Sequence, residues 1–208
     1  MTNPIKQTVW RSFFALGVIV VVLFASSWFF FPVDQVLVSG TKNLAAKEVA
    51  QMAGVARGNP WLWVSTARAV ALEREPWVLR ASIVKRFPGQ ITIRLVERLP
   101  LAIWKQTGKT VVIAEDGTVL PGAKATLILE GESQARFAES LLVARTAKDM
   151  GATRVKFDSN GFLVSFKSGQ IWAQTHDSLL KHGESVRMMV MQSRGKRVNV
   201  YTWGVSVQ

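Results

Sequence analysis

The feature that most constrains this chain is a run of 22 residues, Ser12–Val33, without a charged side chain. A helix rises ~1.5 Å per residue, so a helix of this length spans the ~30 Å hydrocarbon core of a bilayer. Trp10 and Trp28 stand near its two ends, as aromatic anchors at a membrane interface do. Pro32 then stops the helix. The run predicts a transmembrane helix over residues 12–33, anchored by Trp10, Arg11 and Trp28.

Two other structures share part of this pattern: a cleaved signal peptide and a helix buried in a protein core. Ala25 and Ser27 form the small-x-small pair of a cleavage site, but the apolar run continues past them through Trp28–Phe31. A helix of this length that packs into a protein core usually keeps a polar stripe, and this run has none. The transmembrane helix is therefore the preferred prediction.

The tail before the run carries Lys6 and Arg11 and no acidic residue. Positively charged flanks stay preferentially on the cytoplasmic side of a membrane. This bias predicts a cytoplasmic tail over residues 1–11 and an extracytoplasmic chain from Asp34 onward. The expected localisation is the cell (inner) membrane, crossed once, with the N-terminus in the cytoplasm.

The net charge of +12 would suggest a nucleic-acid partner in a cytoplasmic protein, because Lys and Arg neutralise phosphates. The basic residues are instead scattered from Lys6 to Arg197, and a chain outside the cytoplasm does not meet nucleic acid. We therefore expect no nucleic-acid partner. Between Arg187 and Arg197 the charge is purely positive, which either attracts an acidic partner or is ordinary solvated charge.

Residues that could support catalysis or metal binding are sparse. The chain has no cysteine, which excludes disulfides, thiolate nucleophiles and Cys-ligated zinc. Its two histidines, His176 and His182, lack the i,i+4 spacing of a zinc-binding helix. No phosphate-binding loop, dinucleotide fingerprint or nucleophile elbow occurs. The sequence predicts a protein that is not an enzyme and that uses no metal or cofactor.

Strands and helices are expected to alternate in the region that follows the apolar run. Apolar and polar residues alternate in three segments, which predicts strands over residues 33–40, 77–84 and 91–96. Helical spacing of apolar residues predicts short helices over residues 44–53 and 66–74. The predicted order is β-α-α-β-β.

Residues 100–208 keep a strand-rich pattern with more hairpins. The strongest signal is Asn160-Gly161, because Asn-Gly favours the tight turn of a hairpin. Helices are predicted over residues 133–150 and within 177–192. Strands are predicted over residues 101–104, 111–114, 118–120, 155–157, 162–166, 171–173, 197–201 and 205–207. The predicted fold class is α+β, and this part is a mostly antiparallel β domain with helices.

Several motifs stand in a distinctive order along the extracytoplasmic region. They are Val36-Leu37-Val38-Ser39-Gly40, Pro76-Trp77-Val78, Arg86-Phe87-Pro88, Val96-Glu97-Arg98-Leu99-Pro100 and Asp116-Gly117. This order resembles the FtsQ/DivIB family of bacterial cell-division proteins. The resemblance implies a cytoplasmic tail over residues 1–11, a membrane helix over 12–33, a POTRA domain over 34–99 and a β domain over 100–208.

The resemblance also implies a function, because members of that family are scaffolds and not enzymes. It implies a bitopic protein of the divisome, at the division septum, that binds other division proteins outside the cytoplasm. The expected partners are FtsB/DivIC-like and FtsL-like bitopic division proteins, other divisome proteins and the lipid bilayer. The alternative is another POTRA-bearing envelope protein that assists protein assembly or secretion.

The C-terminal segment 198–208 is the predicted partner surface, because it resembles the family segment that ends in an edge strand. The unpaired N–H and C=O groups of an edge strand can bond to an added strand. Tyr201 and Trp203 are either interface anchors or aromatic residues that close the domain core. The family's Asp-x-Arg-Tyr pattern is not kept, since Asn199 replaces the acid. The predicted partner-binding residues are Val198, Asn199, Val200, Tyr201, Thr202, Trp203 and Val205.

Overall fold

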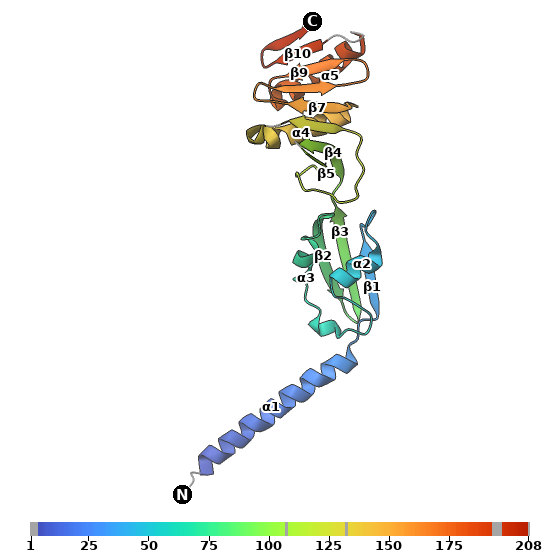
Figure 1. The fold of residues 1–208 in the computed structure, drawn as a ribbon. Coiled ribbons are helices and arrows are strands. Elements are labelled where there is room, and N and C mark those ends of the chain that lie inside the picture. Colours follow the sequence, from blue (N-terminus) through green and yellow to red (C-terminus); the bar gives the residue numbers. More distant parts are fainter. Residues whose placement is uncertain (1–3, 107, 132, 193–196, 208) are drawn as a thin grey trace. The chain divides into compact units, whose positions relative to one another are not determined.

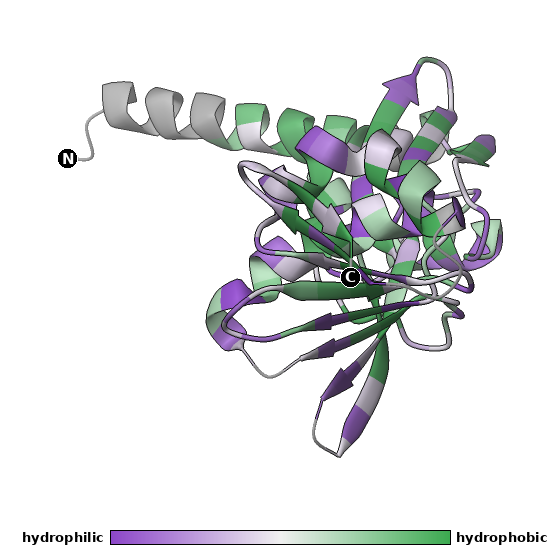
Figure 2. Ribbon diagram, turned by 90° about the horizontal axis from the view of Figure 1, so that it is seen from above, coloured by the Kyte–Doolittle hydropathy of each residue, from purple (hydrophilic) through white to green (hydrophobic). Residues whose placement is uncertain are grey.

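The computed structural model describes residues 4–106, 108–131, 133–192 and 197–207. The chain divides into two compact units, Met1–Glu97 and Arg98–Gln208 (Figure 1). The first unit opens with helix α1 (Pro4–Phe30), and the described turns of α1 are predominantly hydrophobic (Figure 2). Within the described residues, no helix combines the length and the hydropathy that a membrane crossing requires.

A small mixed sheet forms the rest of the first unit. Its order is β1-β3-β2, with β1 (Gln35–Ser39) parallel to β3 (Gln90–Glu97) and β2 (Val78–Arg86) antiparallel to β3. The connection from β1 to β2 contains α2 (Ala46–Met52), the short 3-10 turn η1 (Trp61–Trp63) and α3 (Arg68–Leu72). The predicted β-α-α-β-β order is confirmed, and η1 is an addition to it.

The core of this unit lies between the sheet and its two helices. Ile91, Ile93 and Leu95 of β3 are buried, while the alternate residues on the same strand point to the other face. Val49 of α2 and Leu72 of α3 are fully buried in the same cluster. The strict alternation that predicted β3 therefore reflects a sheet with one covered face.

The second unit is an eight-stranded sheet in the order β11-β10-β9-β8-β7-β6-β4-β5. Its strands are β4 (Pro100–Gln106), β5 (Lys109–Ala114), β6 (Ile128–Gly131), β7 (Arg154–Phe157), β8 (Phe162–Ser165), β9 (Gln170–Ala173), β10 (Arg197–Tyr201) and β11 (Gly204–Val207). Three neighbouring pairs are parallel (β4/β6, β6/β7 and β9/β10), and the other four are antiparallel. The sheet is thus mixed, and antiparallel pairing prevails only narrowly.

Helices α4 (Phe137–Asp149) and α5 (His176–Gln192), together with the short turn η2 (Gln134–Arg136), complete this unit. Both helices bury one side against the sheet. Val143, Ala144 and Ala147 of α4 and Leu179 and Val186 of α5 are fully buried in one cluster with valines and isoleucines of the strands. Successive strand residues point to opposite faces, so the alternate residues form a second, open face of the sheet.

One row of that open face crosses seven strands in register. It begins on β4, passes through the centre of the sheet and reaches β11. Its members are Lys105, Glu130, Lys156, Leu163, Trp172, Asn199 and Ser206. The row is charged at its β4 end and aromatic near its β10 end.

The segment Thr118–Leu120, predicted to be a strand, is instead a short cover on the outer edge of β5. Val119 forms an isolated antiparallel bridge with Ile113. The Leu120 N–H donates to the Val112 carbonyl and the Ala114 N–H donates to the Thr118 carbonyl, both at 2.8 Å. The segment is too briefly paired to make a strand, but it occupies main-chain groups of β5.

The sequence prediction omits β6, which lies between β4 and β7 and is parallel to both. A strand enclosed by parallel neighbours has a short apolar run as its signal. Leu127, Ile128 and Leu129 are that run, and Leu127 and Leu129 are buried.

Candidate partner-binding surface

The predicted partner segment forms the last two strands of the large sheet. β10 and β11 are joined by the two-residue turn Thr202-Trp203, with Tyr201 opposite Gly204. β10 also pairs with β9, so β11 is the edge strand of the sheet in the described part of the chain. The edge presentation expected of the whole segment thus applies to β11 alone.

Three of the predicted partner-binding residues are buried. Val198 and Val200 are 0% exposed and belong to the core beneath α5, and Asn199 is 5% exposed. The physical reason is that β10 is paired on both sides and directs its valines toward the helices. Side-chain contacts of Val198 and Val200 with a partner would require a change in the core, whereas Asn199 lies in the row on the opposite face of the sheet. That the segment binds a partner stays a prediction.

An aromatic group lies where β10 turns into β11. The Tyr201 ring stacks on the Trp203 ring at a centroid distance of 5.0 Å and an angle of 9°. The Tyr201 ring also contacts the Trp172 ring of β9, at a centroid distance of 5.5 Å. Trp203 is 79% exposed, and Thr202 beside it is exposed as well. Neither Tyr201 nor Trp203 belongs to the buried core, so the two aromatics do not close it.

The outer edge of β11 offers main-chain groups for pairing. A two-residue turn places a hydrogen-bonded pair next to it, and such pairs alternate along an antiparallel ladder. Tyr201/Gly204 and Asn199/Ser206 are therefore the bonded pairs, and Val205 and Val207 point their N–H and C=O groups away from β10. Val205 is half-buried against the core, whereas Val207 is 49% exposed.

Helix α5, which packs on β10, also exposes large apolar side chains. Leu180 and Met188 are 56% and 65% exposed, on the helix whose Leu179 and Val186 are buried in the core. Sequence reasoning missed these residues and Trp172. In the helix, the periodic apolar residues were all attributed to its buried side. Two large apolar residues eight positions apart, which share a helix face, were the available signal.

The basic stretch that precedes β10 is only partly described. Arg187 on α5 and Arg197 on β10 are exposed. Arg194 and Lys196, which belong to the same stretch of sequence, lie outside the described residues. Trp10, Arg11 and Trp28 lie on α1, but their side chains are also outside those that the structure describes.

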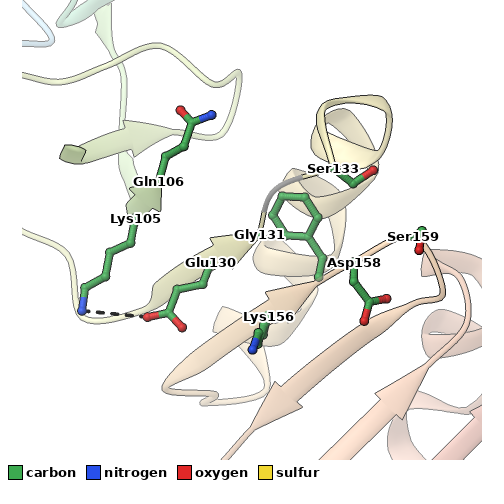
Figure 3. A pocket seen from close by; sticks show the side chains of 9 residues that line it. Lys105, Gln106, Glu130, Gly131, Ser133, Lys156, Asp158 and Ser159 are labelled. Atoms are coloured by element: carbon green, nitrogen blue, oxygen red, sulfur yellow. Dashed lines mark ion pairs between the residues drawn. The ribbon is translucent and has the colours of Figure 1, made fainter. Parts of the chain in front are cut away.

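A hollow of about 680 Å³ lies at the carboxyl ends of β4, β6 and β7 (Figure 3). Glu130 forms ion pairs with Lys105 at 3.9 Å and with Arg154 at 3.3 Å. Asp158 accepts hydrogen bonds from the main-chain N–H groups of Asn160 and Gly161, so it closes a turn. The acids of this hollow are thus engaged within the protein, and its lining residues include no histidine.

The two histidines lie on α5 and show no metal-site arrangement. The Nε2 atom of His176 is 3.2 Å from the Thr146 hydroxyl, and the His176 main-chain N–H donates to Glu139. Among the described residues, no group of three or more acidic or histidine side chains gathers in a way that could hold a metal ion.

Comparison with known proteins gives related matches of different lengths. The family described as POTRA domain, FtsQ-type, matches residues 31–98. The Cell division protein FtsQ of Bradyrhizobium diazoefficiens is 37% identical over 92 residues, covering 43% of this chain and 27% of that protein. The protein of the same name from Bartonella bacilliformis is 31% identical over 99 residues, covering 47% and 32%.

A longer match reaches into the second unit. The Cell division protein FtsQ of Streptomyces bingchenggensis is 26% identical over 190 residues, covering 88% of this chain and 66% of that protein. The matched region is thus shorter than two thirds of each of these three relatives.

Proposed function

Because this chain belongs to the FtsQ/DivIB family of bacterial cell-division proteins, we propose that it is a bitopic scaffold of the divisome. In this proposal its extracytoplasmic domains bind FtsB/DivIC-like and FtsL-like division proteins at the septum, and it catalyses no reaction. The relatives reported above carry the name Cell division protein FtsQ, which supports this proposal over the alternative of an assembly or secretion factor.

The membrane part of the proposal assigns α1 to the bilayer. Except for the half-buried Ser26, the described side chains of α1 are apolar and exposed, including Phe14 at 71%, Leu23 at 64% and Phe24 at 53%. Exposed apolar surface along a helix is unfavourable in water and is expected where lipid surrounds the helix. We assign residues 1–11 to the cytoplasm, 12–33 to the membrane, 34–99 to the POTRA domain and 100–208 to the β domain.

The orientation can be tested with a reporter that is active only outside the cytoplasm. Fused after Gln208, such a reporter is expected to be active, because Lys6 and Arg11 hold the tail inside. The same reporter fused before Met1 serves as the control and should be inactive. Activity of the N-terminal fusion alone would reverse the proposed orientation.

The observation that carries the scaffold proposal is the edge strand β11 with the exposed Trp203 at its start. A partner strand added to β11 would pair with the outward groups of Val205 and Val207. The Trp203 indole, 79% exposed, would then provide the apolar contact that such edges need for specificity.

Trp203→Ala is expected to weaken capture of the FtsB-like partner by about 2 kcal/mol, roughly 30-fold in Kd, and to leave the fold intact. The fold is expected to survive because the indole is largely exposed and packs only on Tyr201 among the ring contacts that are described. Binding is measured by titration of the detergent-solubilised full chain, with folding followed by circular dichroism.

The matched control is Leu142→Ala, which removes a 51% exposed apolar residue of α4 in the same unit. It should bind like the parent. Equal affinity of a well-folded Trp203→Ala variant and the parent would place the partner surface elsewhere.

A further inference from the structure

Three segments meet at the end of the POTRA domain that follows α1: residues 31–35, the loop 57–63 and the β2–β3 turn 86–90. Main-chain hydrogen bonds of 2.8–2.9 Å hold them together. The donors and acceptors are Val33 N–H to Asn59 O, Gly58 N–H to Val33 O, Trp61 N–H to Phe31 O and Asp34 N–H to Gly89 O. The chain that leaves α1 is thus bonded directly to both loops.

Large apolar side chains gather on these two loops, and we call them the aromatic tip (Trp61, Leu62, Trp63 and Phe87). Trp61 is half-buried against the core, and the other three are exposed. Phe87 is 69% exposed, Leu62 49% and Trp63 46%. The Phe87 ring contacts Trp61 and also Phe31, both at 5.8 Å, so the tip is continuous with the segment after α1. A clustered apolar surface of this kind in a folded domain marks a contact with another apolar phase or molecule.

The tip is held in place from beneath. Lys85 Nζ donates to the Leu62 carbonyl at 3.0 Å and lies 4.6 Å from the centre of the Trp61 ring. The Trp61 indole N–H donates to the Gln90 carbonyl at 3.1 Å. These contacts tie η1 to β2 and β3, so Leu62 projects from a fixed backbone. The Trp63 ring packs against Phe24 of α1 at a centroid distance of 4.2 Å, which joins the tip to the helix.

The charges around the tip are mainly positive. Arg57 and Arg86 are exposed on the two loops. Asp34 is the one acidic residue among the three segments that form this end of the domain. Aromatic rings favour the headgroup layer of a membrane, and basic side chains favour its anionic lipids.

We propose that the aromatic tip inserts into the interfacial layer of the bilayer that surrounds α1, with Arg57 and Arg86 facing anionic headgroups. This inference rests on the proposed membrane helix. It assigns the POTRA domain a second contact with lipid, made by its own folded surface, besides the helix that precedes it.

Lipid is the favoured occupant because of the distance that the chain allows. Phe30 ends α1 and the carbonyl of the next residue, Phe31, already accepts from the Trp61 N–H, so a single residue step of about 4 Å separates helix and tip. The interfacial layer on each side of a bilayer is ~5–8 Å deep. A tip tethered this closely lies within reach of the headgroups whenever α1 spans the membrane.

The absence of cysteine allows a site-specific test in the full chain. Single variants Leu62→Cys, Val20→Cys and Val96→Cys are labelled with an environment-sensitive fluorophore and reconstituted into phosphatidylcholine vesicles with and without phosphatidylglycerol. Quenching by lipids brominated near the headgroup reports shallow contact, and quenching by lipids brominated deep in the acyl chain reports the span. Leu62→Cys keeps the Lys85 contact, which is made to the main chain.

Val96 is the matched control because it is 52% exposed but lies at the other end of β3, ~20 Å from Gln90 at ~3.3 Å per residue. We expect strong shallow quenching at position 62, weakened without phosphatidylglycerol, deep quenching at position 20 and neither at position 96. Deep quenching at position 20 with position 62 matching position 96 would overturn the inference and leave the membrane helix standing. Loss of quenching at position 20 would instead overturn the membrane helix. If position 62 is unquenched as well, both the membrane helix and the lipid contact of the aromatic tip are ruled out.

Discussion

Glu97→Gln is expected to destabilise the POTRA domain by about 2–4 kcal/mol, because each buried donor left without an acceptor costs ~1–3 kcal/mol. Glu97 is 7% exposed at the end of β3. Its Oε1 accepts from the main-chain N–H groups of Lys42, Asn43 and Leu44 at 2.7–3.1 Å. Its Oε2 accepts from the main chain and the side-chain amide of Asn43 at 2.9 and 2.8 Å.

The substitution keeps the size of the side chain but replaces one acceptor oxygen with an NH₂ group. That NH₂ group cannot accept the hydrogen bonds that Asn43 donates, and its own N–H groups then face the N–H donors of Asn43. The connection between β1 and α2 then loses its attachment to β3. Urea unfolding of the full chain in detergent measures the stability, and hydrogen exchange of the amides of residues 42–44 should rise in the variant.

The same carboxylate predicts a pH dependence. Burial alone would raise the pKa of Glu97, but the hydrogen bonds from Lys42, Asn43 and Leu44 outweigh it, so the pKa lies below its ordinary value of 4.5. The unfolded chain therefore binds this proton more readily than the folded one. The stabilisation is complete above pH 4.5 and is lost as the pH falls from there through the lower pKa of the folded state.

The difference between parent and Glu97→Gln isolates this contribution. The pKa of Asp116, in the other unit, is also lowered. Burial alone would raise this pKa, but the hydrogen bonds from Arg98 and Thr118 outweigh that effect. That effect is common to both proteins and cancels in the difference. The stability gap should be largest near neutral pH and should shrink in acid; a gap that stays constant with pH would contradict the assigned role of the carboxylate.

Val207→Pro is expected to reduce capture of the FtsB-like partner about tenfold or more, since an unmet hydrogen bond costs ~1–3 kcal/mol. The N–H of Val207 points outward from β11, so proline removes a donor that a partner strand would use and puts its ring in the path of that strand. The fold should be kept, because proline is tolerated on an edge strand where the N–H faces outward. Affinity is measured by titration of the full chain, with circular dichroism as the check of folding.

Val207→Thr is the control, because it keeps the N–H and the β-branched shape and should bind nearly as the parent does. Ser206→Pro is the opposite case, since its N–H bonds to Asn199 across the hairpin, and that variant should lose the β10–β11 pairing itself. Unchanged binding by a folded Val207→Pro variant would show that the partner does not add a strand to β11.

Local patterns in the sequence predicted most elements, because these depend on neighbours along the chain. Asn160-Gly161 marks the β7–β8 hairpin, and the alternation of Ile91, Ile93 and Leu95 marks a strand with one buried face. β6 was not predicted, because four residues between two parallel neighbours show a short apolar run and no long alternation. Thr118–Leu120 has a strand-like composition but pairs with β5 at a single isolated bridge, Ile113–Val119.

The structure of the proposed partner segment was only partly predictable for a related reason. Trp203 is exposed and β11 is an edge strand in the described part of the chain, while binding of a partner there stays a prediction. The burial of Val198 and Val200 follows from the parallel pairing of β10 with β9. These two strands are neighbours in the sheet although the whole of α5 separates them in the sequence. The residues of β10 alone do not indicate such a crossover. The contact between the Trp172 and Tyr201 rings depends on the same pairing of β9 with β10.

The two ends of the large sheet differ, and the difference sets how many chains can join. On β5 the groups of Val112 and Ala114 are already bonded to Thr118–Leu120, and the uncovered start of the strand carries an exposed lysine, Lys109. At β11 the outward groups of Val205 and Val207 have no strand beside them in the described part of the chain. In the proposed binding mode, one covered end and one receptive end give the module a valency of one: it accepts a single partner strand at β11, and the cover on β5 opposes further growth of the sheet.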